Sequence, residues 1–121
     1  MIKEAYVSFE VAKLLKEKGF NELCTAKYCT DGRFDRSFYY YKNSEINKDA
    51  YNAPTQQLAM QWLREVQYLW IDIDPLTNHK WTWSIWFMND PKLKTGESSQ
   101  VISTYEEACE AAIKYCLTNL I

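Results

Sequence analysis

The sequence predicts an α+β fold, built as a two-layer sandwich of helices on a mainly antiparallel sheet. Three helical patterns and two hairpin patterns alternate along the chain, in the order helix, hairpin, helix, hairpin, helix. Runs of this kind favour helices packed on an antiparallel sheet over a parallel one. The chain has 121 residues, of which 47% are hydrophobic, so we expect a single globular domain over residues 1–121.

The composition excludes several classes of protein. The 14 basic and 16 acidic residues give a net charge of −2, without the clustered basic surface typical of proteins that bind duplex nucleic acid. One histidine and three isolated glycines leave few histidine-based sites and no glycine loop for phosphate. The sequence shows neither a membrane-spanning stretch nor a secretory signal. We therefore expect a cytoplasmic protein without cofactor or membrane partner, in which the four cysteines are free thiols.

The first helix is predicted over residues 9–18. Ser8 is a good N-cap residue, and apolar residues recur behind it at helical spacing. Gly19 follows at the position that requires a left-handed backbone. Phe20 can then fold back on Leu15, which completes a Schellman motif and ends the helix.

The first hairpin is predicted around a three-residue loop, Thr30-Asp31-Gly32, with Gly32 at the left-handed last position. This loop separates a mostly apolar face from a polar face, as a half-buried sheet requires, whereas a two-residue Asp-Gly turn mixes them. The expected pairs are Tyr28 with Phe34 and Cys24 with Phe38 on the apolar face, and Lys27 with Asp35 and Thr25 with Ser37 on the polar face.

The middle of the chain is predicted to form a loop followed by a second helix. Residues 42–53 are polar, and Pro54 suits the first turn of a helix over 54–67. Apolar residues recur at helical spacing in this helix and include Trp62. We expect Trp62 and Trp83 to be buried between this helix and the second hairpin.

The second hairpin is predicted from strands at 68–74 and 80–88, joined by a turn at 75–79. Opposite residues of an antiparallel pair share a face, so matching the two apolar faces requires an even sum of paired residue numbers. The pairing of Ile73 with Trp81 is one such register.

A polar loop over 89–100 precedes the last helix, which is predicted over 104–119. Ser103 or Thr104 begins this helix, because a glutamate follows each of them three positions later and forms a capping box. The inner side of the helix carries alanine, isoleucine, cysteine and leucine.

Three stretches of the chain also resemble a known family: Ser8–Phe20, Ala53–Glu65, and Thr104–Ala108 together with Ala111–Ile113. They resemble small uncharacterised proteins carried by gut bacteria and their phages or other mobile elements. The resemblance supplies no activity. It implies an accessory, cytosolic protein of a mobile element.

The surplus of aromatic residues, 16% of the chain, is the main candidate for a functional feature. Several of them lie on the face of the second hairpin that turns away from the core, and two tyrosines lie on the polar face of the first. If helices cover one side of the sheet only, these residues form an exposed interaction patch, since aromatic residues dominate binding hot spots. The alternative is that a helix or loop covers them. The candidate patch consists of Tyr68, Trp70, Trp86, Met88, Tyr39 and Tyr41.

The sequence leaves three functional interpretations. The preferred one is a non-enzymatic interaction protein that binds a protein partner or a second copy of itself through this patch. The alternative is a module that stacks a small aromatic ligand, a nucleotide or single-stranded nucleic acid on residues such as Trp70 and Trp86; basic groups beside the aromatic side chains would favour it. The least favoured is a metal-dependent enzyme using Asp72 and Asp74, since strand and turn positions account for both residues without a metal.

Overall fold

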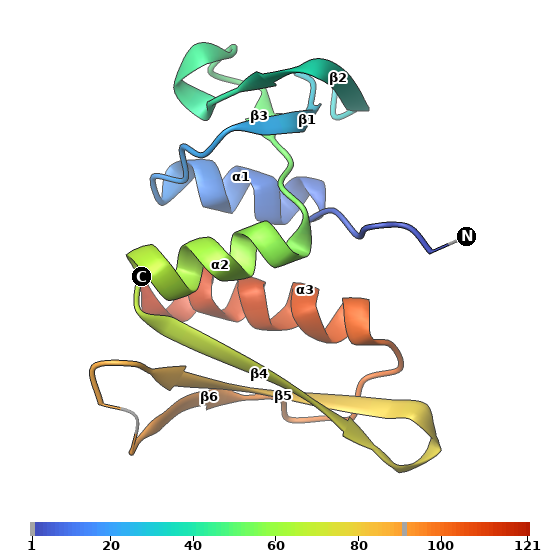
Figure 1. Ribbon diagram of the computed structural model, residues 1–121, viewed down its shortest axis with the longest axis vertical. Coiled ribbons are helices and arrows are strands. Elements are labelled where there is room, and N and C mark those ends of the chain that lie inside the picture. The colour runs from blue at the N-terminus through green and yellow to red at the C-terminus, as the bar shows by residue number, and fades with distance from the viewer. Residues whose placement is uncertain (1, 91) are drawn as a thin grey trace. The chain divides into compact units, whose positions relative to one another are not determined.

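The computed structural model describes residues 2–90 and 92–121. Over these residues the chain forms three α-helices and two antiparallel three-stranded sheets, which confirms the α+β class (Figure 1). The chain divides into two compact units, Met1–Gln57 and Leu58–Ile121, and each unit holds one of the sheets. The strands thus form two sheets, where the sequence had suggested one. In the described part of the chain, no helix combines the length and the apolar character needed to cross a membrane.

The first unit packs helix α1 (Phe9–Glu17) against a sheet with the strand order β2-β1-β3. The core between them is formed by Val11, Ala12 and Leu15 of the helix and by Cys24 and Ala26 of the central strand. The strands are β1 (Cys24–Tyr28), β2 (Phe34–Tyr41) and β3 (Tyr51–Asn52).

Both ends of α1 are as predicted. The hydroxyl of Ser8 accepts a hydrogen bond from the backbone N–H of Val11, at 3.2 Å, and caps the first turn. At the other end Gly19 has a φ of +94°, and the N–H of Phe20 donates to the carbonyl oxygen of Leu15 at 2.9 Å. This is the Schellman geometry, in which a left-handed glycine lets the chain reverse over the last turn.

The three-residue loop of the first hairpin is confirmed. Gly32 has a φ of +85°, and Cys29 donates its N–H to the carbonyl oxygen of Arg33 at 2.8 Å across the base of the loop. The expected pairing of Tyr28 with Phe34 and of Lys27 with Asp35 follows directly.

Further from the loop, the predicted register of this hairpin is wrong. An irregularity between Cys24 and Ala26 places Cys24 opposite Tyr41, so the pairing with Phe38 is absent and Phe38 is fully exposed. The same irregularity replaces the expected pairing of Thr25 with Ser37. Ser37 Oγ accepts the backbone N–H of Tyr39 at 3.0 Å, and a local bond of this kind competes with the regular ladder. A bulge of this kind bends the strand and re-aims the side chains beyond it.

The polar segment 42–53, expected as a loop, contains the short strand β3 and a single 3-10 turn, Asn43–Glu45. Buried Asn43 organises the segment, because its Nδ2 donates to the carbonyl oxygen of Phe20 and its Oδ1 accepts the N–H of Asn52, at 2.8 and 2.9 Å. Asn52 lies opposite Lys27 on β1. Side-chain hydrogen bonds therefore order a segment that has little apolar surface of its own.

The second unit places helix α3 over a sheet with the strand order β4-β5-β6 (Figure 1). Helix α2 begins at the boundary between the units, at Gln56, two residues later than predicted from Pro54. The elements are α2 (Gln56–Val66), β4 (Leu69–Leu76), β5 (Lys80–Phe87), β6 (Lys94–Glu97) and α3 (Tyr105–Tyr115), which a π-helical turn (Cys116–Leu120) extends.

The second hairpin has the even-sum register that was predicted, shifted by two residues. Ile73 lies opposite Trp83, where the example register had placed Trp81. The shift arises because β4 continues through Pro75, which leaves a turn of Thr77–His79 only. Proline is tolerated here because β4 is an edge strand, where a missing N–H costs no ladder bond.

One further expectation concerns the start of α3. The Thr104 hydroxyl accepts a hydrogen bond from the backbone N–H of Glu107 at 3.0 Å, so of the two candidates Thr104 is the N-cap.

Trp62 and Trp83 are buried as predicted, at 5% and 6% exposure. The helix ring that packs on Trp83 is Tyr115 of α3, 5.3 Å between centroids, where the sequence had suggested the second helix. Strand β6 lies within the segment 89–100, which was expected as a loop.

Candidate functional site

The candidate site is the outer face of the second sheet, the face turned away from α3. On β4 and β5, the inward residues Leu69, Ile71, Trp83 and Ile85 are buried. Successive side chains of a strand alternate between faces, so their neighbours point outward. The core register therefore decides which residues the outer face presents.

The outer face consists of cross-strand rows. Trp70 lies opposite Trp86, and Trp86 lies opposite Lys94 of β6. The next row runs from Asp72 through Ser84 to Glu97, and Asp74 follows opposite Thr82. The aromatic row thus borders one row that carries carboxylates, and a second such row lies beyond it.

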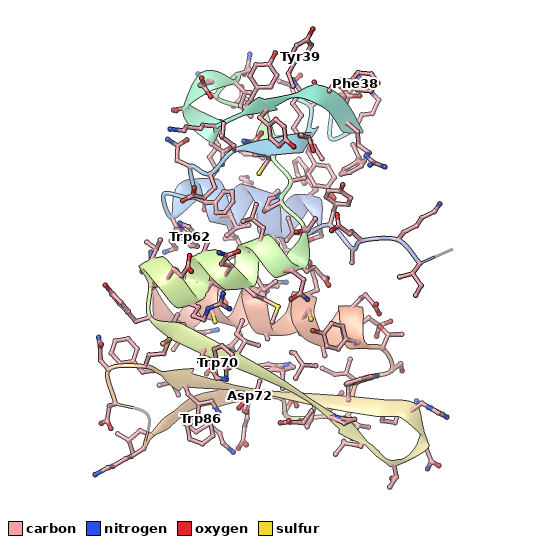
Figure 2. The ribbon with its side chains drawn as sticks, in the orientation of Figure 1. Phe38, Tyr39, Trp62, Trp70, Asp72 and Trp86 are labelled. Carbon is pink, nitrogen blue, oxygen red and sulfur yellow. The ribbon has the colours of Figure 1, made fainter. Side chains whose placement is uncertain are left out.

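The aromatic row borders an open hollow. Its volume is about 380 Å³, and its lining residues are Trp70, Asp72, Trp86 and Met88. Figure 2 shows Trp70, Asp72 and Trp86 on adjacent parts of β4 and β5. Trp70 and Met88 are 41% and 44% exposed, and Tyr68 beside them is 51% exposed. Three of the six residues singled out in the sequence thus line one hollow, and Tyr68 precedes β4 beside them.

Hydrogen bonds orient both indole rings. Trp70 Nε1 donates to Asp72 Oδ1 at 2.8 Å, two residues along β4 on the same face. Trp86 Nε1 donates to Ser84 Oγ at 3.3 Å, two residues along β5. Each ring therefore has its polar edge engaged by a neighbouring side chain of its own strand.

A cation lies over each indole ring. Arg64 Cζ lies 5.8 Å from the Trp70 ring centroid, and Lys94 Nζ lies 5.6 Å from that of Trp86. Lys94 also pairs with Glu97 at 3.0 Å. Sequence reasoning missed both cations, because Lys94 lies on a strand that was expected to be a loop and Arg64 comes from another element, α2.

The two tyrosines of the predicted patch lie in the other unit. Tyr39 and Tyr41 belong to β2, are 70% and 39% exposed, and have ring centroids 6.5 Å apart. Figure 2 shows Tyr39 projecting from β2 on the side away from α1. The sequence patch is therefore divided between the two units, and only the other four residues belong to the second.

The carboxylates and thiols offer little for catalysis. Asp72 and Asp74 share a face of β4, but the carboxylate of Asp72 already accepts a hydrogen bond from the indole N–H of Trp70. Among the described residues, no cluster of three or more potential metal ligands occurs. The four cysteines are free, and burial raises the pKa of Cys24 and Cys116 to about 12. Burial also raises the pKa of Cys109, to about 11. Thiols with such pKa values are poor nucleophiles at neutral pH.

Comparison of the chain with protein-family models, curated proteins and solved structures found no match. The resemblance of the three helical stretches to proteins of mobile elements thus stays a prediction.

Proposed function

We propose that this protein is a non-enzymatic cytoplasmic interaction protein that associates with a second copy of itself through the outer face of the second sheet. The observation that supports this is the cross-strand pair Trp70–Trp86, which lines an open hollow together with Met88. Tryptophan and methionine are enriched in the cores of protein interfaces, and tryptophan among hot spots.

The distribution of charge favours a second copy as the occupant. Cations lie at the aromatic end of the face, on Arg64 and Lys94, and carboxylates lie toward the turn, on Asp72 and Asp74. A two-fold interface brings a surface against its own reversed copy. The cations of one copy then face the carboxylates of the other while the indoles are covered. Arg64 makes no ion pair with any described residue, so its charge is available for such a contact.

A second candidate function is supported by the same two cations. A planar ligand with negative charge, such as a nucleotide or a single strand of nucleic acid, would stack on an indole and pair with Arg64. Base stacking on an aromatic side chain contributes about 1–3 kcal/mol per base and tolerates any sequence. The carboxylates of Asp72 and Asp74 oppose a polyanion on this face, which places this function second.

The experiment measures the mass in solution by light scattering over a range of protein concentrations. We expect the wild type to dimerise and the double variant Trp70→Ser, Trp86→Ser to be monomeric with an unchanged circular dichroism spectrum. Phe38→Ser, which removes a fully exposed aromatic side chain from the first unit, is the matched control and should still dimerise.

Two outcomes contradict the proposal. If the wild type is monomeric at every concentration, a second copy does not cover the outer face. If that monomer's tryptophan fluorescence is quenched by oligothymidylate, and the double variant does not bind it, the second candidate is supported. A double variant that dimerises like the wild type shows that the outer face is not the interface.

A further inference from the structure

A cavity within the first unit is separate from the outer face and has the features of a small-molecule site. Its volume is about 310 Å³, the space of roughly ten water molecules, which is at the lower end of the range for ligand sites. Strands β1, β2 and β3 form one part of the lining, and the last residue of the 3-10 turn, Glu45, together with the segment after it forms the rest.

A row of three polar side chains crosses the sheet at this cavity. Lys27 on the central strand lies opposite Asp35 on one side and Asn52 on the other. Residues paired in this way share a face, so the three side chains are neighbours. Lys27 and Asp35 are half-buried, and no ion pair joins either of them to another described residue. Their charges are therefore available to a ligand.

Asn52 presents a fixed acceptor to the cavity. The residue is 1% exposed, its Nδ2 donates to the carbonyl oxygen of Tyr41 at 2.6 Å, and its Oδ1 receives no hydrogen bond from the described residues. Among those residues, every side-chain N or O atom that is shut off from solvent has a partner. Oδ1 therefore keeps some contact with solvent, and the cavity that Asn52 lines provides it. A buried amide oxygen held in this way needs a donor from water or from a ligand.

The far wall of the cavity is also held in place. Glu45 Oε1 accepts the backbone N–H of Lys42 at 2.8 Å, which fixes this carboxylate at the cavity. Lys16 of α1 donates to the carbonyl oxygens of Asn47 and Ala50, at 3.0 and 2.8 Å, and so ties the segment that forms the wall to the helix. A wall fixed before binding reduces the entropy lost on binding.

The charges of the lining specify the ligand. Asp35 and Glu45 supply two carboxylates, Lys27 supplies one ammonium group, and Asn52 supplies one more acceptor. Lys27 and Asp35 are half-buried, so a ligand that pairs with them is favoured over one that leaves them unpaired, whereas Glu45 lies at the exposed rim. We propose that the cavity binds a small molecule with two amino groups and one carboxylate, the chemical class of the free dibasic amino acids. The amino groups pair with Asp35 and Glu45, and the carboxylate pairs with Lys27.

The test is a titration of the isotope-labelled full chain with L-ornithine and L-lysine, followed by amide resonances in NMR spectra. We expect saturable shifts on β1, β2 and the segment after Glu45. L-norleucine, which has the length of lysine but no terminal amine, and L-glutamate, with the opposite net charge, should bind at least about tenfold more weakly, a difference of about 1.4 kcal/mol, because each lacks one of the two amino groups that pair with the carboxylates.

Two variants and one control locate the site. Asp35→Asn and Lys27→Met should each weaken the binding of L-lysine about tenfold or more, whereas Asp31→Asn, in the exposed hairpin loop, should leave it unchanged. The outer-face variant Trp70→Ser, Trp86→Ser should also bind normally, which separates this proposal from the proposed function. Absence of shifts, equal shifts with L-norleucine and L-glutamate, or unchanged binding by the folded cavity variants would overturn it. The selectivity among ligands needs no variant, so the test stands even if a variant fails to fold.

Discussion

The ring of Tyr115 in α3 lies directly against the Cα atom of Gly96 in β6. A Cβ atom at Gly96 would meet Cε1 of Tyr115 at 2.5 Å. The same ring packs on the buried indole of Trp83, with centroids 5.3 Å apart. The contact joins an edge strand of mostly polar residues to the core of the second unit, and only glycine leaves room for it.

This contact predicts the effect of a single methyl group. Gly96→Ala should lower the free energy of unfolding by about 1–3 kcal/mol, because the Tyr115 ring is held by Trp83 and cannot move freely. Chemical denaturation measures the change. In a Tyr115→Ala background the same substitution should cost much less, and an equal cost in both backgrounds would show that the ring is not the obstacle.

The buried Trp83 predicts a much larger effect. Truncation to alanine should cost about 3–5 kcal/mol, since it removes a large side chain from a packed core. A loss of this size approaches the whole stability of many domains. Thermal unfolding followed by circular dichroism measures it, with Phe38→Ala as the control at a fully exposed aromatic residue. A Trp83→Ala protein that melts within a few degrees of the wild type would contradict the packing described.

The four thiols should differ in reactivity in the folded protein. Cys24, Cys109 and Cys116 are buried with raised pKa values, whereas Cys29 is half-buried. We expect a disulfide reagent to modify one thiol per chain rapidly without denaturant and all four in denaturant. Cys29→Ser should abolish the rapid reaction. Rapid modification of a second thiol in the wild type would show that at least one of the other three is accessible.

The same burial predicts a loss of stability at alkaline pH. The thiols of Cys24 and Cys116 have a pKa of about 12 when folded, against an ordinary value of 9.0. Above pH 9 the unfolded chain loses these protons while the folded chain retains them, so the free energy of unfolding falls as pH rises toward 12. Each thiol contributes up to about 1.4 kcal/mol per pH unit in this window.

Substitution of a buried cysteine separates the loss of stability caused by its thiol from other effects of alkaline pH. Cys116→Ala should be less stable than the wild type at pH 7, because it leaves a small cavity, and its stability should fall less steeply above pH 9. Cys29→Ala serves as the control. Denaturation curves at several alkaline pH values give the slopes, and equal slopes for Cys116→Ala and the wild type would contradict the raised pKa.

Local features of the fold could be read from the sequence because nearby residues cause them. The Ser8 cap and the left-handed Gly19 need only the residues of α1 and the turn after it. The alternation of apolar residues along β4 and β5 predicted that Trp70 and Trp86 lie on the face opposite the core. Successive side chains of a strand point to opposite faces whatever surrounds the strand. The aromatic part of the candidate site was therefore predictable.

Contacts between distant segments decided the rest. Strands β3 and β6 are short and polar, and they form because β1 and β5 offer free edges to pair with. Lys94 over Trp86 and the row of Asp35, Lys27 and Asn52 follow from those pairings, so neither was visible in the sequence. By itself the sequence determined both ends of α1, the loop of the first hairpin and the face to which each residue of β4 and β5 belongs. The tertiary structure alone decided the division into two sheets and the groups beside the aromatic residues, because such pairing depends on edges that exist only after the neighbouring strands have formed.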